Sequence, residues 1–82
     1  MEFSILRKTM LEVRTNHLII LVSYQTPVAC YDLSTNKWYK SATKHSPTTS
    51  RHINEWTKRL GMIYPNWNLL PQEYFNNIFE EQ

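Results

Sequence analysis

The chain has 82 residues, of which 41% are hydrophobic and 20% charged, so its composition is that of an ordinary globular protein. This length predicts one domain, residues 1–82. A single glycine, Gly61, excludes the glycine-rich phosphate loops of nucleotide-dependent enzymes, which need several glycines. The net charge of +2 conceals an asymmetry, since residues 33–60 contain six Lys or Arg and one Glu. This basic middle segment favours an anionic partner.

Cysteine usage and hydropathy predict a cytoplasmic location. Cys30 is the only cysteine, so no internal disulfide can form, which is typical of a reducing compartment. The longest apolar run, residues 18–22, is far shorter than the roughly 20 residues that span a bilayer. The N-terminal residues include charged side chains and lack the pattern of a signal peptide. We therefore expect no membrane association.

A small antiparallel β-meander of three to four strands is predicted between about residues 9 and 44. Its centre is the aliphatic run at 18–22, which is typical of a strand covered on both faces. Proline and polar clusters separate this strand from its neighbours. The expected strands are therefore residues 9–14, 18–22, 28–31 and 37–44, and residues 1–8 fit either a helix or a strand.

Two helices are predicted after the sheet, which gives an α+β fold. Ser46 and Pro47 form a helix start signal, and Gly61 is a typical stop, so the first helix runs over about 47–60. Ile53 and Trp56 begin an apolar stripe that predicts burial of Trp56 against the sheet. A second apolar stripe predicts a short helix over about 71–80. We expect both helices to pack on one face of the sheet.

Metal binding and catalysis find little support in the sequence. Cys30 and the histidines lack the close spacing of zinc ligands, and a lone cysteine on a strand is usually a small buried hydrophobe. The acidic residues are scattered, with three of them near the C-terminus, so no carboxylate pair for acid–base chemistry stands out. We therefore expect no catalytic residue, no metal, no cofactor and a non-enzymatic role.

The predicted helix start is the strongest candidate for a binding site. Free helix-start amides, hydroxyl groups, Arg51 and two histidines would converge there, which favours an anion such as a nucleic-acid phosphate. Lysines of the preceding strand would extend this surface, and Trp38 or Tyr39 would be available for base stacking. An equally simple interpretation is helix capping beside a solvated strand edge. The candidate residues are Lys37, Trp38, Lys40, Lys44, His45, Thr48, Thr49, Ser50, Arg51 and His52.

Aromatic residues near the C-terminus form a second candidate surface. A domain of this size cannot bury all eleven of its aromatic side chains, and exposed Trp and Tyr are favoured at protein interfaces. Tyr64, Trp67 and Tyr74 are the interface candidates. They favour a homodimer or a partner protein.

Two segments of the sequence resemble a known family. The segment 22–29 reads VSYQTPVA, and Ser46 is followed by TTSRHINEW at 48–56. Together they resemble small uncharacterised proteins of phages and plasmids that carry SYxTPVA and TTSRHIN motifs. The resemblance implies a mobile-element origin and the cytoplasm of a host cell, and it assigns no functional residue.

The sequence therefore leads to two hypotheses. In the first, the chain is a small accessory protein of a phage or related element that binds nucleic acid through a basic strand and a helix N-terminus. In the second, it binds and modulates a host protein complex through exposed aromatic anchors.

Overall fold

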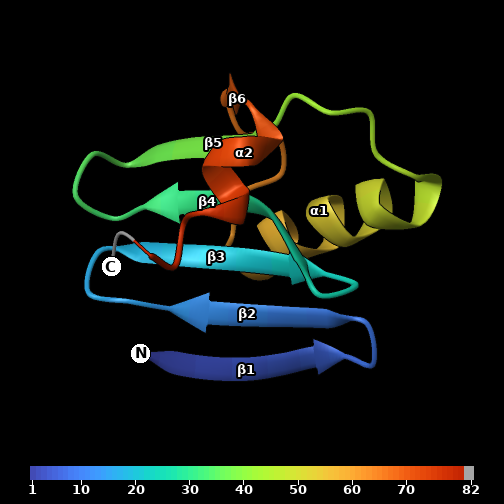
Figure 1. Ribbon diagram of the computed structural model, residues 1–82, viewed down its shortest axis with the longest axis horizontal. Coiled ribbons are helices and arrows are strands. Elements are labelled where there is room, and N and C mark those ends of the chain that lie inside the picture. Colours follow the sequence, from blue (N-terminus) through green and yellow to red (C-terminus); the bar gives the residue numbers. More distant parts are fainter. Residues whose placement is uncertain (81–82) are drawn as a thin grey trace.

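Six strands and two helices make up the computed structural model, which describes residues 1–80 (Figure 1). The α+β class is confirmed, although the sheet has more strands than the three or four predicted. In chain order the elements are β1 (Glu2–Arg7), β2 (Met10–Arg14), β3 (Leu18–Ser23), β4 (Thr26–Asp32), β5 (Lys37–Ser41), α1 (Pro47–Arg59), β6 (Trp67–Leu70) and α2 (Gln72–Asn76).

The strands lie in the sheet in the same order as in the chain. Strands β1 to β5 are antiparallel neighbours, as expected for a meander. Strand β6 then pairs with β5 in parallel, with Trp38 opposite Trp67. This parallel pair requires a crossover connection, which α1 provides. The predicted sheet, which ended at about residue 44, therefore lacked this last strand.

The ambiguous N-terminal residues form strand β1. Phe3 lies opposite Val13 and Ile5 lies opposite Leu11, so the apolar side chains of β1 and β2 share one face of the sheet. The register shifts between Ile5 and Arg7, which brings Arg7 opposite Met10 on the other face. The sheet therefore begins at residue 2 rather than at about residue 9.

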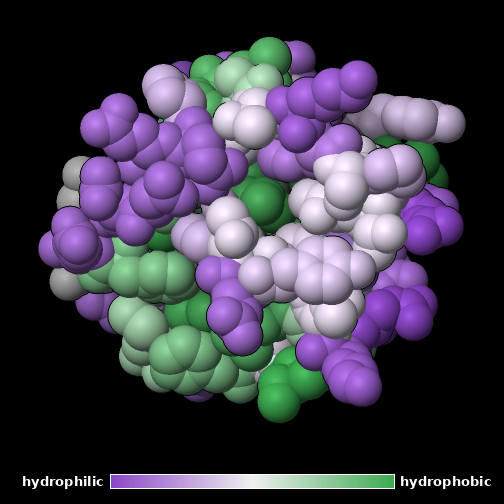
Figure 2. Space-filling model, turned by 45° about the vertical axis from the view of Figure 1, so that its right-hand side comes forward, coloured by the Kyte–Doolittle hydropathy of each residue, from purple (hydrophilic) through white to green (hydrophobic). Residues whose placement is uncertain are grey.

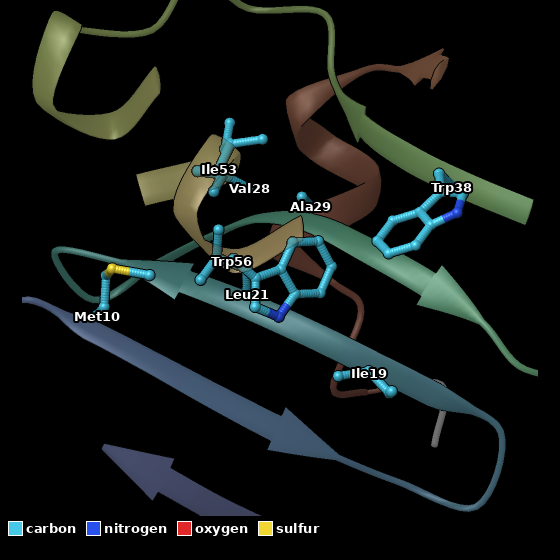
Figure 3. Packing of buried hydrophobic residues seen from close by; sticks show 8 residues of the cluster. All are labelled: Met10, Ile19, Leu21, Val28, Ala29, Trp38, Ile53 and Trp56. Atoms are coloured by element: carbon cyan, nitrogen blue, oxygen red, sulfur yellow. The ribbon is translucent and has the colours of Figure 1, made fainter. Parts of the chain in front are cut away.

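The two helices cover opposite faces of the sheet, so the prediction that both pack on one face is wrong. Side chains alternate along a strand, and β3 accordingly contributes to two separate clusters. Ile19 and Leu21 pack with Ile53 and Trp56 of α1, as Figure 3 shows. In the other cluster, the remaining apolar side chains of β3 pack with side chains of α2 and of the turn that follows it. These residues are Leu18, Ile20, Val22, Phe75 and Ile78.

Helix α1 begins and ends as its sequence predicts. The hydroxyl of Ser46 accepts a hydrogen bond of 3.2 Å from the Thr49 amide, and Pro47 occupies the first helical position. At the other end Gly61 has a φ of 84°, and its amide donates to the Lys58 carbonyl while the Met62 amide donates to the Thr57 carbonyl. This pair of bonds is a Schellman motif, which needs a left-handed residue.

Helix α2 is shorter than the predicted helix at 71–80. It ends at Asn76, and residues 77–80 form turns. Phe75 and Ile78 are nevertheless buried, whereas Phe79 is exposed, so only part of the predicted stripe belongs to the core. Within residues 1–80, neither helix has the length and apolar character needed to cross a membrane.

Candidate nucleic-acid interface

A buried polar cluster anchors the start of α1 to the sheet. His52 Nδ1 lies 2.9 Å from the hydroxyl of Ser23, and His52 Nε2 lies 3.3 Å from the hydroxyl of Thr9. The Ser23 hydroxyl also lies 3.1 Å from that of Thr49. Tyr24 covers the imidazole, with 5.6 Å between the ring centroids. The cluster thereby joins the β1–β2 turn, the end of β3 and the first turns of α1.

This cluster is structural, and it removes two predicted ligands from the candidate site. His52 is 7% exposed and Thr49 is 9% exposed, and their polar atoms are engaged within the protein. Burial lowers the pKa of His52, so the neutral imidazole is favoured in the folded state. Ser23 is 2% exposed, so no substrate reaches the Ser23–His52 pair. Thr49 and His52, which the sequence offered as anion ligands, therefore lie within the protein rather than on the outer surface of the helix start.

Basic side chains lie on the outer face of α1, which is the face that points to solvent. Arg51, Lys58 and Arg59 are all exposed, as are the uncharged Ser50 and Asn54 between them. Positions 51 and 58 are seven residues apart, which places them on one side of a helix. None of these three cations forms an ion pair within residues 1–80. Arg51 does contact the hydroxyl of Thr48 at 3.4 Å.

The one acidic residue of this face is engaged by a basic residue of the sheet. Nε and Nη2 of Arg7 donate hydrogen bonds to the two carboxylate oxygens of Glu55, each at 2.5 Å. This pair lowers the pKa of Glu55 and raises that of Arg7, because each charge stabilises the other. A hollow of about 300 Å³ lies beside the pair, lined also by Thr48 and Arg51. Because Arg7 neutralises the charge of Glu55, the outer face of α1 has an excess of positive charge.

The lysines of the predicted basic strand lie at different places. Lys44 is exposed in the loop that leads into α1. Lys40 lies with its ammonium 5.1 Å from the centroid of the Trp67 ring, which is a cation–π contact. Lys37 is exposed at the opposite end of β5, beside the β4–β5 turn. Lys37 is thus separated by the length of β5 from the chain that enters α1.

Trp38 is not available for base stacking. Its side chain is 6% exposed and contacts Trp56 and Trp67 edge to face, with centroid distances of 5.6 and 5.9 Å.

His45, at the helix start, is half-buried, and its Nε2 is shielded from solvent with no hydrogen-bond partner within residues 1–80. Of the predicted helix-start residues, Ser50 and Arg51 are exposed and Thr48 is partly exposed.

Three basic residues of this surface were missed by the sequence interpretation. Lys58 and Arg59 are not among the predicted candidates, and Arg7 lies in the segment 1–8, whose sequence fits either a helix or a strand. The seven-residue interval from Arg51 to Lys58 is the signal that would have found the outer face of α1. No local pattern predicts the contact between Arg7 and Glu55, which are 48 residues apart.

The three aromatic interface candidates differ in exposure. Tyr64 is 91% exposed in the loop between α1 and β6, next to Ile63 at 64%. Trp67 packs on the α1 side of the sheet, and Tyr74 packs on the α2 side and contacts Phe75 edge to face. Only Tyr64 therefore presents most of its side chain to solvent.

The remaining reactive groups are isolated or buried. Cys30 is fully buried in the sheet, and burial raises the pKa of its thiol to about 12, so the unreactive protonated form predominates at neutral pH. Within residues 1–80, no three His, Cys, Asp or Glu side chains gather in a group suited to a metal ion.

The sequence model of DUF8033, a family of unknown function, matches residues 3–67 of the chain. The chain belongs to this family. The matched region of this DUF8033 member runs from β1 through α1 to the first residue of β6. It therefore contains both Ser23 and His52, the two residues at the centre of the buried polar cluster. Helix α2 lies outside the matched region. No curated protein and no solved structure matches the chain.

Proposed function

We propose that this protein binds nucleic acid through the outer face of α1. The observation that carries this proposal is the exposure of Arg51, Lys58 and Arg59, none of which forms an ion pair within residues 1–80, on a helix face whose carboxylate, Glu55, is occupied by Arg7. Cations without a carboxylate partner are available to neutralise phosphates, and the release of counterions from the nucleic acid then drives binding. Lys44, in the loop that enters α1, extends the same surface.

The geometry favours contacts to the phosphate backbone over contacts to bases. Of the two residues expected to stack on a base, Trp38 lies in the core and Tyr39 packs on the α2 side of the sheet. The outer face of α1 consists of basic and short polar side chains, which contact phosphates without reading sequence. We therefore propose sequence-independent binding, and its physiological setting would be that of a non-enzymatic accessory protein. The resemblance of segments 22–29 and 48–56 to proteins of phages and plasmids supports such a protein of a mobile element in a host cell.

Fluorescence anisotropy with labelled DNA and RNA at several salt concentrations tests this proposal. Each neutralised phosphate contributes about 0.9 to the slope of log K against log salt on duplex DNA, and about 0.7 on a single strand. Arg51→Ala and Lys58→Ala should each weaken binding to all sequences alike and lower this slope by about one phosphate's share. Both side chains are exposed, so the fold should persist.

Lys37→Ala is the matched control, because it removes the same charge from an exposed position two residues from Tyr39, on the face of the sheet opposite to α1. It should bind as the wild type does, apart from a small effect of net charge. The proposal is wrong if the wild type binds neither DNA nor RNA at low salt, or if Arg51→Ala and Lys58→Ala behave like Lys37→Ala.

A second candidate function, binding to a host protein, is favoured by the loop between α1 and β6. Ile63 and Tyr64 are both largely exposed there, and aromatic side chains in such positions act as anchors at protein interfaces. Affinity capture from nuclease-treated host lysate would test this function. One stoichiometric protein captured by the wild type and lost with Tyr64→Ala would support it.

A further inference from the structure

Strand β1 forms an open edge of the sheet. It pairs with β2 on one side, and no strand within residues 1–80 pairs with its other side. Its backbone amide and carbonyl groups on that side are therefore available to another strand. Natural proteins usually protect such an edge with proline, with inward-pointing charges or with a covering segment. The stretch from Phe3 to Leu6 contains neither proline nor charge.

The side chains of β1 add an uncovered apolar surface to this open edge. Phe3 is 64% exposed and Ile5 is 81% exposed, on the face of the sheet that α2 covers only farther along, over β3 and β4. A hollow of about 420 Å³ lies next to Ile5, and its lining includes Leu11 and Val22 as well as the polar residues of the adjoining turns. In Figure 2, green apolar residues gather along the lower edge of the molecule, where β1 lies in Figure 1.

We propose that two copies of this chain associate through antiparallel pairing of their β1 strands about a two-fold axis. A two-fold interface uses the same surface on both copies, so the strand must complement itself. Residues directly opposite each other in an antiparallel pair point to the same face, so the axis must pass beside a residue rather than between two residues. An axis at Ser4 places Phe3 of each copy opposite Ile5 of the other copy.

The charges at the ends of β1 favour this register. Glu2 and Arg7 both point to the α1 face, Glu2 being opposite Arg14 and Arg7 contacting Glu55. With the axis at Ser4, Glu2 lies opposite Leu6 of the second copy and beside its Arg7, so opposite charges come close at both ends of the shared ladder. An axis at Ile5 would instead place Ile5 opposite itself and the apolar Phe3 opposite Arg7. Of these two axes, only the one at Ser4 pairs Phe3 with an apolar side chain.

Sedimentation over a range of concentrations tests the association. A single strand pair is smaller than the roughly 1,600 Å² of a standard interface, so we expect a dimer that forms at micromolar concentration and dissociates on dilution. Ile5→Lys introduces a typical edge-protecting charge opposite Phe3 and should give a monomer of 9.9 kDa. Ile63→Lys, a matched control at a comparably exposed isoleucine, should still form the dimer.

Cysteine cross-linking tests the register independently of affinity. Opposite residues of an antiparallel pair have Cα atoms about 4.5 to 5.5 Å apart, which is within the range that a disulfide bridges. With the axis at Ser4, Ser4→Cys should form a cross-linked dimer under mild oxidation, and Ser4→Cys combined with Ile5→Lys should not. Ser50→Cys, equally exposed on α1, is the control for random collision, and Cys30 is buried and does not interfere.

Three results would overturn the inference. They are a wild type that remains monomeric at high micromolar concentration, an Ile5→Lys variant that still forms the dimer, and a Ser4→Cys variant that cross-links no faster than Ser50→Cys. Loss of the dimer in Ile63→Lys alone would place the interface at the loop between α1 and β6. Because these measurements use no nucleic acid, they are independent of the proposed function.

Discussion

His52 shows how single residues set the placement of α1. The imidazole bonds to Ser23 of β3 and to Thr9 of the β1–β2 turn, so one side chain fixes the helix start against two parts of the sheet. The segments VSYQTPVA and TTSRHINEW, which stand apart in the sequence, meet in this contact. Their joint occurrence therefore has a structural explanation that requires no ligand.

Protonation of His52 should destabilise the protein. Burial lowers the pKa of His52 in the folded state, whereas the unfolded chain binds a proton near pH 6.5. Stability is therefore complete above about pH 6.5 and falls as the pH drops toward the lowered pKa of the folded state. Urea unfolding between about pH 5 and pH 7.5 measures this dependence, and His52→Gln should make it flatter.

The acidic groups of the protein act in a separate pH range. Hydrogen bonds from Ser34 lower the pKa of Asp32, and the contact with Arg7 lowers that of Glu55. Their stabilising effects are lost only as the pH falls below about 4. A free energy of unfolding that does not change between about pH 5 and 6.5 would therefore contradict the neutral, buried state of His52.

The β3–β4 turn contains two residues in an unfavourable backbone conformation. Tyr24 and Gln25 have φ angles of 50° and 70°, a region that residues with a Cβ atom rarely occupy. Gln25→Gly should therefore raise the free energy of unfolding by about 1 kcal/mol, because glycine adopts this conformation without strain. Thermal melting checks this prediction, and Lys8→Gly, in a turn whose lysine has an ordinary φ, should not stabilise the protein.

At the scale of elements, α1 is held to the sheet chiefly by Trp56. The indole is completely buried, and its Nε1 donates a 3.0 Å hydrogen bond to the buried carboxylate of Glu12, which Arg14 also contacts. Trp56→Ala should cost about 3 to 5 kcal/mol, which is a large part of the stability of a domain of this size. Chemical denaturation measures this cost, and a variant that melts as the wild type does would contradict the placement of α1.

The sequence predicted those elements whose signals are local. The cap at Ser46, the stop at Gly61 and the aliphatic run at 18–22 lie in the elements that they mark. Strand β6 has no such signal, because its four residues become a strand only by pairing with β5. An apolar stripe shows that a helix is covered but not which face of the sheet it covers. The run at 18–22 did indicate coverage on both faces, which two helices on one face cannot provide.

The candidate site was predicted only in part, for the same reason. Arg51 and Lys44 are exposed near the helix start as expected, whereas Trp38, Thr49 and His52 are buried. Polar residues at a helix start are compatible with both a ligand and a structural cluster, and the partners of Thr49 and His52 come from distant segments. Sequence spacing alone does not distinguish these two roles.

At the scale of the whole molecule, the proposed dimer and the proposed function fit together. Pairing of β1 about an axis perpendicular to the sheet places both copies of α1 on one face of a continuous sheet. Strands lie about 4.8 Å apart, so helices seated over β3 and β4 would be separated by roughly 24 to 34 Å. One turn of duplex DNA repeats after about 34 Å, so both outer faces would reach the same duplex.

A nuclear magnetic resonance titration of the labelled protein with a short duplex at low salt tests nucleic-acid binding by α1 most directly. We expect amide shift changes to concentrate on the outer face of α1, at Arg51, Lys58 and Arg59, and to disappear when salt is raised. Amides near Lys37 should remain unchanged. No shift changes at low salt, or changes confined to the loop around Tyr64, would contradict nucleic-acid binding by this face.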